Sequence, residues 1–349
     1  MARKNRVVCR DAFYHVTSRV VNRAFLLADP AFKDEMAEWI YGVAGYCGVD
    51  VLAWCIMDNH FHLLVHVPEV PERYRTGPAV PDSHAFGMRP PECNPPRWEP
   101  AGGEDGAPTA AARPETGFSM SDEEMLGRLA MLYGARRARA VRLGWERLRA
   151  DGRGAEVEAE KDRHCRRMYN LSLFVKTLKE RVAQRLNRRT GRRGQLWDGR
   201  FHSGVVEGSA AVLGVVAAYI GRNPVRAGIV RSPACYRWSS LAQALGDGTH
   251  AERCRAGYER LLGRPWDECR RVLLAATTAD DAGRGGGTAL REAWTGASAV
   301  MAGAFVGVGE AFAAAVSAAV PVGFPCASVR RCVARCRTLA WSMPGISAA

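Results

Sequence analysis

Several patterns that would assign a protein to a class are missing from this 349-residue chain. No Gly-x-x-x-x-Gly-Lys-Ser/Thr loop occurs, which argues against a large replication or conjugation initiator that carries a helicase. The basic N-terminus lacks the apolar core of a targeting segment. The 11 cysteines are scattered and follow no secretory segment, so we expect reduced thiols and a cytoplasmic protein. Cys326, Cys332 and Cys336 cluster near the end, but their spacing fits no standard zinc pattern.

Long apolar runs are also scarce. The stretch 297–324, rich in alanine, glycine and valine, is the one candidate for a membrane span, but it contains Glu310 and many small residues. This composition fits a helix in water better than a membrane helix. We therefore expect no membrane partner.

Acidic residues are in the minority. The chain has 49 Lys and Arg against 36 Asp and Glu, which gives a net charge of +13. Such an excess predicts a polyanionic partner, most simply nucleic acid. Residues 161–205 contain 13 of the basic residues and only 3 acidic ones, so this segment carries most of the excess.

Two histidines one residue apart, His60 and His62, lie in an apolar run from 51 to 67 that is typical of a strand, with a polar break at 58–59. Side chains at i and i+2 point to the same face of a strand, so the two imidazoles are expected side by side. They could form half of a metal site, although two exposed or hydrogen-bonded histidines would give the same pattern. His66 has the same parity and is expected at the rim or in a structural role.

A strand at 12–21 and a helix at 30–46 precede this run, and together they suggest an α/β sandwich. From about residue 68 to residue 116 the hydrophobic periodicity disappears, which predicts a flexible insertion. A helix is expected to start at Ser121, because acidic residues fill the turn that follows. A charged helical arm should continue from there.

Apolar residues at steps of three or four between 168 and 186 predict a helix whose other faces are basic. The segment after it, 191–202, interleaves arginines with aromatic side chains. Such a helix and loop suit contacts with phosphates and stacking on unpaired bases, although a charge run is usually a solvated surface. The residues expected to contact DNA are Lys176, Lys179, Arg185, Arg188, Arg189, Arg192, Arg193, Trp197, Arg200 and Arg226.

A further apolar helix is expected from 210 to 220, and it should end at Asn223-Pro224, because a residue before proline disfavours the α region. Tyr219 falls in the last turn of this helix. Asn223, four residues on, lies near the same face. On this segment alone, Tyr219 is more simply a packing residue than a catalytic one.

The combination of these pieces resembles the IS200-like, REP-associated tyrosine transposases, a branch of the HUH single-strand endonucleases. The stretches that carry the resemblance are 13–19 (FYHVTSR), 57–65 (MDNHFHLLV), 187–201 (NRRTGRRGQLWDGRF), 218–230 (AYIGRNPVRAGIV) and 236–240 (YRWSS). One departure is Val20, which stands where a glycine commonly follows the first-strand arginine in relatives.

The resemblance implies a role for each matching residue. His60 and His62 match the metal-binding pair, Asn223 matches the position of a third metal ligand, and Tyr219 matches the nucleophile. The implied cofactor is Mg²⁺ or Mn²⁺, and the implied partner is single-stranded DNA with hairpins. The implied reaction forms a 5′-phosphotyrosine bond, releases a 3′-hydroxyl and reverses to rejoin strands.

The implied fold is α+β, an antiparallel sheet flanked by helices in a ferredoxin-like sandwich. The expected boundaries are a transposase-like domain at 1–68 and 166–245, an insertion at 69–165 and an alanine-rich helical extension at 246–349. The competing hypothesis is a domesticated protein that binds DNA hairpins without cutting them. The sequence does not decide between a monomer and a homodimer.

Overall fold

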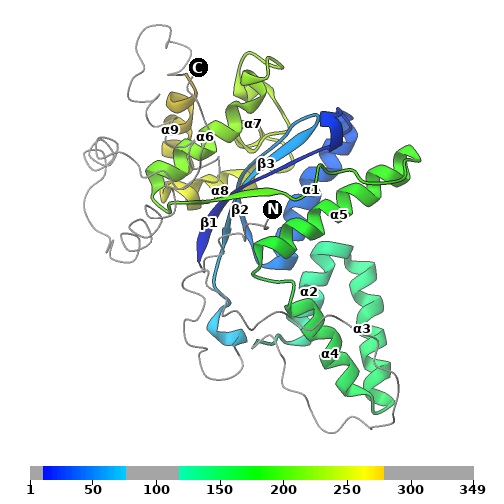
Figure 1. The fold of residues 1–349 in the computed structure, drawn as a ribbon. Helices are drawn as coiled ribbons and strands as arrows, with labels where there is room; N and C mark the ends of the chain where they lie inside the picture. Colours follow the sequence, from blue (N-terminus) through cyan, green and yellow to red (C-terminus); the bar gives the residue numbers. More distant parts are fainter. Residues whose placement is uncertain (1–10, 76–117, 279–349) are drawn as a thin grey trace, which may run out of the picture. The chain divides into compact units, whose positions relative to one another are not determined.

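The computed structural model describes residues 11–75 and 118–278. These residues form two compact units (Figure 1). The sheet unit contains residues 12–38, 50–66 and 182–278. The helical unit contains residue 11 and residues 39–49, 67–75 and 118–181. Each unit is described by itself.

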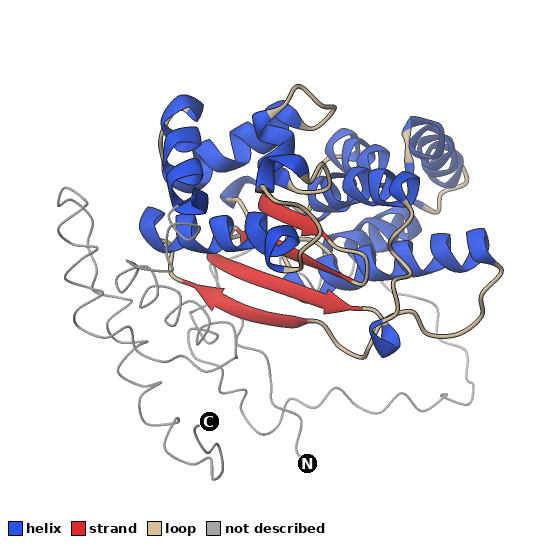
Figure 2. Ribbon diagram, turned by 90° about the horizontal axis from the view of Figure 1, so that it is seen from above, coloured by secondary structure: helices blue, strands red, loops and turns tan. Residues whose placement is uncertain are grey.

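The sheet has four strands, shown in red in Figure 2. They are β1 (Ala12–Arg19), β2 (Asp50–Ile56), β3 (His60–Val67) and β4 (His202–Val206). Their order across the sheet is β2-β3-β1-β4, and the pairs β2–β3 and β1–β4 are antiparallel. This is the order of a ferredoxin-like β-α-β-β-α-β sheet. The expected antiparallel sheet with flanking helices is therefore confirmed.

The polar break inside the apolar run proves to be a turn. The strand expected from 51 to 67 is a hairpin of β2 and β3, and the backbone N–H of Met57 donates to the carbonyl of His60 across its closed end at 2.8 Å. Two antiparallel strands can be joined by so short a connection. The hairpin leaves His60 and His62 at the start of β3.

Helices complete both units. The α-helices are α1 (Pro30–Cys47), α2 (Asp122–Tyr133), α3 (Ala135–Ala150), α4 (Gly154–Cys165), α5 (Leu171–Thr190), α6 (Ala210–Arg226), α7 (Ser240–Leu245), α8 (Ala251–Leu262) and α9 (Trp266–Thr278). Short 3₁₀ turns occur at Val21–Arg23, Glu72–Tyr74 and Pro233–Cys235. No helix in the described part of the chain is both long and apolar enough to cross a membrane. The stretch 297–324 lies outside the described residues.

In the sheet unit, α6 and α8 both pack against β2 (Figure 1). The approach of α8 is close, because a Cβ added at Gly257 would lie 2.9 Å from the carbonyl oxygen of Leu52. The hydroxyl of Tyr258 on the same helix lies 2.8 Å from Ser240 Oγ, which in turn accepts a bond from the backbone N–H of Trp54. Residues beyond 245 are thus part of the packing around the sheet.

In the helical unit, α2, α3 and α4 follow one another with short connections. The expected helix start at Ser121 is confirmed, since its hydroxyl accepts a bond from the backbone N–H of Glu124 at 3.2 Å. Gly134 joins α2 to α3 with a φ of 85°, a conformation that favours glycine. Trp145 of α3 is buried, and its ring N–H donates to Glu160 of α4 at 2.9 Å.

A buried lysine holds the turn that precedes the histidine pair. Lys33 on α1 is 2% exposed and forms an ion pair with Asp58 in that turn. Its Nζ also donates to Tyr236 Oη at 2.8 Å and lies 4.4 Å from the centre of the Trp238 ring. The segment 236–240 thus contacts this turn through Lys33.

We expect Lys33→Met to lower the free energy of unfolding by about 3 kcal/mol, because Asp58 would lose the cation that compensates its partial burial. Urea unfolding followed by circular dichroism measures the loss. Lys176→Met is the matched control, since Lys176 is exposed and its pair with Glu180 is worth only about 0.3–0.5 kcal/mol. Equal losses in the two variants would contradict a structural role for Lys33.

Candidate active site

Three histidines from two neighbouring strands meet on one face of the sheet. His60 and His62 lie on β3, and their ring centres are 5.0 Å apart, which confirms the shared face expected from the sequence. His15 on β1 stacks on His62 with ring centres 5.3 Å apart. His15 and His62 are buried, whereas His60 is half-buried.

Tyr219 reaches the same place from α6. Its ring stands edge-on to His62 at 5.8 Å and to His15 at 6.0 Å between ring centres. The guanidinium of Arg226, two turns further along α6, lies 5.2 Å from the centre of the Tyr219 ring. The fold thus joins the histidine pair to this tyrosine, although more than 150 positions separate them in the sequence.

Hydrogen bonds engage the Nδ1 atom of both paired histidines. His60 Nδ1 lies 2.6 Å from Asn59 Oδ1, and the amide of Asn59 is oriented because its Nδ2 donates to the carbonyl of Arg23. Since Asn59 Oδ1 can only accept, the proton of a neutral His60 is on Nδ1. His62 Nδ1 lies 3.1 Å from His15 Nε2, and either atom can be the donor. If His62 donates, both rings keep their lone pair on Nε2.

Burial keeps these imidazoles neutral. Desolvation lowers the pKa of His15 to about 4. Desolvation and, to a smaller extent, the nearby Arg19 lower the pKa of His60 to about 4. The pKa of His62 is well below its usual value, mainly because of burial. The neighbouring His15 and His60, and then the positive charges of Arg19 and Arg226, lower it as well. A neutral imidazole offers a lone pair to a metal, whereas a protonated one cannot.

The helix that carries Tyr219 does not end where the sequence predicts. It continues through Pro224 to Arg226, so the predicted end at Asn223-Pro224 is wrong. Proline has no N–H to donate to the carbonyl of Ile220, and the Asn223 side chain supplies a substitute. Its Nδ2 donates to the carbonyl of Tyr219 at 3.0 Å and reaches that of Ile220 at 3.4 Å. The helix therefore continues past Pro224 to Arg226.

The donor set fits a divalent cation with open positions. Two neutral imidazoles could supply nitrogen ligands. Asn223 is half-buried, and because the backbone uses its Nδ2, the atom that it could offer to a cation is its amide oxygen. In the described part of the chain, no three His, Cys, Asp or Glu side chains form a cluster that could hold a metal.

Sequence reasoning missed two members of the site. His15 and Arg19 share one face of β1 by the same alternation that was applied to β3, and both lie in the stretch 13–19 that carries the resemblance. His66 has the structural role that was expected, since it stacks on Phe13 at 4.6 Å and lies 3.3 Å from Asp50 Oδ2.

One residue expected to contact DNA, Trp197, is buried. Trp197 is only 6% exposed, and its ring packs edge-on against Phe61 with centres 5.5 Å apart. Its backbone forms a bridge with Val20 at the end of β1. The neighbouring aromatic Phe201 is also buried. Both rings are part of the core of the sheet unit in this structure.

The basic residues expected to contact DNA differ in their surroundings. Arg185 pairs with Glu35 at 2.8 Å, and Arg189 pairs with Asp29 at 3.0 Å, so these charges are partly compensated. Lys176 and Lys179 belong to the helical unit, where Lys176 lies 3.8 Å from Glu180. Three of the expected DNA-contacting residues are exposed and have no ion-pair partner in the described part of the chain. They are Arg188, Arg193 and Arg200.

Arg192 is a special case among them. It is half-buried, and its Nη1 is a buried nitrogen with no hydrogen-bond partner among the described residues. A buried donor without a partner is costly, so this nitrogen suits an acceptor that arrives with a ligand. The loop that holds it is closed by a bond from Asn187 Nδ2 to the carbonyl of Gly194 at 3.1 Å.

Two other tyrosines are engaged elsewhere. The hydroxyl of Tyr169, in the helical unit, accepts a bond from Arg128 at 2.7 Å. Tyr236 is 3% exposed, and its hydroxyl donates to the carbonyl of Ile56 while accepting from Lys33. Tyr219, by contrast, lies edge-on to His62.

Comparison with known proteins agrees with the resemblance seen in the sequence. The family described as "Transposase IS200 like" matches residues 9–72, a segment that includes β1, β2 and β3 with His15, His60 and His62. No curated protein matches the chain.

One solved structure, a REP-associated tyrosine transposase bound to a REP hairpin, has a TM-score of 0.36 and 11% sequence identity. The match covers 70% of this chain and 86% of that one.

Proposed function

Residues 9–72 are similar to IS200-like transposases, and on that premise we propose that the chain nicks and rejoins single-stranded DNA at hairpins. The observation that carries the proposal is the edge-on contact of Tyr219 with His62, 5.8 Å between ring centres. A phenol beside two neutral imidazoles is the arrangement that a metal-assisted tyrosine nickase needs.

His60, His62 and Asn223 would hold the cation, Mg²⁺ or Mn²⁺. When bound, it would polarise the scissile phosphate and offset the negative charge that develops there. The chain's own part is to orient the ligands. Asn59 fixes the tautomer of His60, and His15 would do the same for His62 by accepting its Nδ1 proton.

Tyr219 would act as the nucleophile. Its Oη forms a bond to the phosphorus while the bond from phosphorus to the 3′-oxygen breaks, and the proton lost by the phenol is balanced by the one that the 3′-oxygen gains. The products are a 5′-phosphotyrosine and a free 3′-hydroxyl. Because one phosphodiester replaces another, the reverse attack can rejoin strands without an external energy source.

Basic side chains around the site would place the DNA backbone. Arg19 and Arg226 lie close enough to influence the paired histidines. Arg192 offers its buried Nη1, and Arg188, Arg193 and Arg200 offer exposed charges. All of these side chains can donate hydrogen bonds to phosphate oxygens and hold the strand for in-line attack.

The test is a covalent adduct. Single-stranded DNA hairpins with single-stranded flanks, labelled on the 5′ or the 3′ side, are incubated with the full chain and Mn²⁺ and separated on a denaturing gel. The label on the 3′ side of the cut is expected to migrate with the protein, and EDTA is expected to abolish it. The hairpins are drawn from palindromes that flank the gene. If these hairpins bind but none gives an adduct with metal present, the chain is a hairpin-binding protein without cleavage activity.

His15 is expected to act as a positioning residue. His15→Phe removes the acceptor for His62 Nδ1 and should weaken Mn²⁺ binding by about 10- to 100-fold, the usual cost of losing such an outer partner. Isothermal titration calorimetry measures the affinity. His15→Gln, which restores an acceptor oxygen, should recover part of it. Equal Mn²⁺ affinities in wild type and His15→Phe would show that His15 only packs.

A further inference from the structure

Helix α3 of the helical unit is unusually basic. Its 16 residues include six arginines and one acidic residue, Glu146. This helix lies outside the stretches that resemble transposases, and the predicted DNA-contacting residues do not include it. Its charge is therefore a property of this chain that the proposed reaction does not use.

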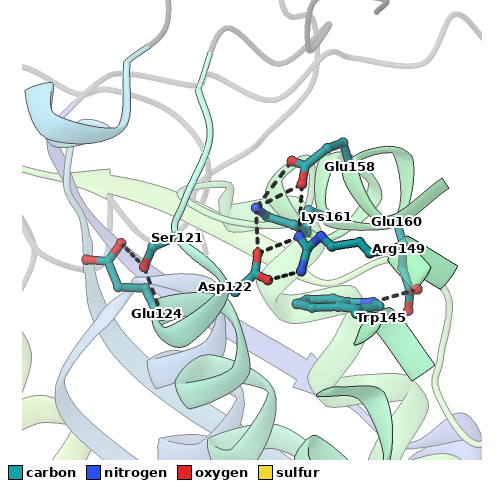
Figure 3. A network of polar contacts seen from close by, with 8 residues as sticks. All are labelled: Ser121, Asp122, Glu124, Trp145, Arg149, Glu158, Glu160 and Lys161. Atoms are coloured by element: carbon teal, nitrogen blue, oxygen red, sulfur yellow. Dashed lines mark hydrogen bonds and ion pairs between the residues drawn. The ribbon is translucent and has the colours of Figure 1, made fainter. Parts of the chain in front are cut away.

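The acidic side chains around α3 are engaged with other cations. Asp122 on α2 accepts bonds from Arg149 at 3.1 Å and from Lys161 at 3.0 Å, and these bonds lower its pKa to about 2 (Figure 3). Glu158 on α4 contacts the same two cations at 3.3 and 3.2 Å. Arg149 is thus the one arginine of α3 that has ion-pair partners in the described part of the chain.

The other acidic residues of α4 are also occupied. Glu156 pairs with Arg153 at 2.6 Å, Glu160 accepts the ring N–H of Trp145, and Asp162 pairs with Arg166 at 2.8 Å. Five arginines of α3 are left exposed and without an ion-pair partner among the described residues. They are Arg136, Arg137, Arg139, Arg142 and Arg147.

The spacing of these residues places three of them together. At 100° per residue, Arg136, Arg139 and Arg147 fall on the face opposite the buried Ala138 and Trp145. With a rise of 1.5 Å per residue they span about 16 Å, more than two phosphate steps of an extended strand. The buried face of α3 is anchored by Trp145 and by the Arg149 network, so the outward arginines stand on a fixed helix (Figure 3).

We infer that α3 is a second DNA-binding surface, which contacts the phosphate backbone of duplex DNA. The outward face carries guanidinium groups, the side chains best suited to phosphate oxygens. Its one aromatic residue, Trp145, is 2% exposed, so the helix has no platform on which unpaired bases could stack. Contact through charge alone favours a duplex, whose phosphates are denser and fixed, and it reads no sequence.

The inference rests on the proposed function only for the choice of DNA as the polyanion. In that setting the surface would bind paired DNA, such as the stem of a hairpin. Binding through α3 needs neither the metal nor Tyr219. It can therefore be tested in EDTA, where failure of the nicking proposal would leave it untouched.

The test uses the full chain with the changes R136Q, R139Q and R147Q combined. Fluorescence anisotropy with a labelled 20-base-pair DNA hairpin of arbitrary sequence is followed between 50 and 200 mM NaCl. The slope of log affinity against log salt should fall in magnitude by about 0.9 for each phosphate that the helix no longer binds, or up to about 2.7 in all. Affinity at 100 mM NaCl should fall at least about ten-fold. With a 20-nucleotide oligothymidine the slope should change by less than about 0.7, the value of a single phosphate on a single strand.

The matched control removes the same charge from exposed arginines elsewhere, R163Q, R270Q and R271Q combined. Circular dichroism and thermal unfolding should be unchanged in both triple variants, since none of the six side chains is buried. A control whose slope falls as much as that of the α3 variant would overturn the assignment, because net charge alone would then explain binding. Equal falls of the salt slope on hairpin and oligothymidine would also overturn it. The same holds if the α3 variant binds both DNAs like wild type and loses only its binding to vesicles of anionic phospholipid, measured by sedimentation, because α3 would then be a lipid-binding surface.

Discussion

Replacing Tyr219 by phenylalanine is expected to eliminate the covalent protein–DNA adduct while leaving hairpin binding within about two-fold of wild type. The change removes only the hydroxyl and keeps the ring that stands edge-on to His15 and His62. Loss of the only nucleophile should reduce adduct formation by about 10⁴-fold or more. A denaturing gel with a labelled hairpin measures the adduct, and anisotropy in EDTA measures binding.

Tyr169→Phe is the matched control for this experiment. Its hydroxyl is bound to Arg128 in the helical unit, so its removal should leave the adduct at wild-type levels. An adduct that persists in Tyr219→Phe but disappears in Tyr169→Phe would move the nucleophile to Tyr169. An adduct that persists in both would point to another group and refute the role of Tyr219.

The second large effect is expected at the histidine pair. His60→Ala combined with His62→Ala removes both nitrogen ligands, and Mn²⁺ binding should fall below detection by calorimetry. Adduct formation should fall by at least about 10³-fold, because the charge that develops on the phosphate would no longer be offset. Binding of the hairpin in EDTA should be retained, since the arginines that we propose to contact phosphates are unchanged.

His66→Ala provides the control on the same strand and the same face. His66 stacks on Phe13 and contacts Asp50, so its loss should affect stability but not the affinity for Mn²⁺. If His66→Ala lowers the affinity for Mn²⁺ as much as the double variant does, His66 would also be needed for metal binding, and the site would not be limited to His60 and His62. Full adduct formation by the double variant would end the metal-dependent proposal.

Local rules predicted much of this site from the sequence. The alternation of a strand places His60 and His62 on one face, and the apolar spacing of 210–220 identifies the helix of Tyr219. The predicted end of that helix was wrong because the rule for a residue before proline considers only the backbone. It cannot foresee that the Asn223 amide will bond the carbonyl of Tyr219 and reach that of Ile220, which Pro224 leaves without an N–H donor.

Other features depend on contacts between distant segments. Trp197 follows arginines in a loop and was expected to stack on DNA, but its ring is buried against Phe61, which lies more than 130 positions earlier. The charges of Arg185 and Arg189 are partly compensated by acidic residues at 29 and 35, about 150 positions away. A count of charges along the chain gives the total correctly, but it does not show which of them the fold neutralises.

The strand order also constrains how this protein can be made. β1 is a central strand whose outer neighbour is β4, and Phe13 pairs with Val206, so nearly two hundred residues must be synthesised between the two partners. At ribosomal rates of about 5–20 residues per second, the edge of β1 stays unpaired for roughly 10–40 s until β4 has been synthesised. An unpaired edge is a site for pairing with other chains. Shortening the segment between β3 and α5 should therefore raise the yield of folded protein during synthesis, even if the stability of the finished fold is unchanged.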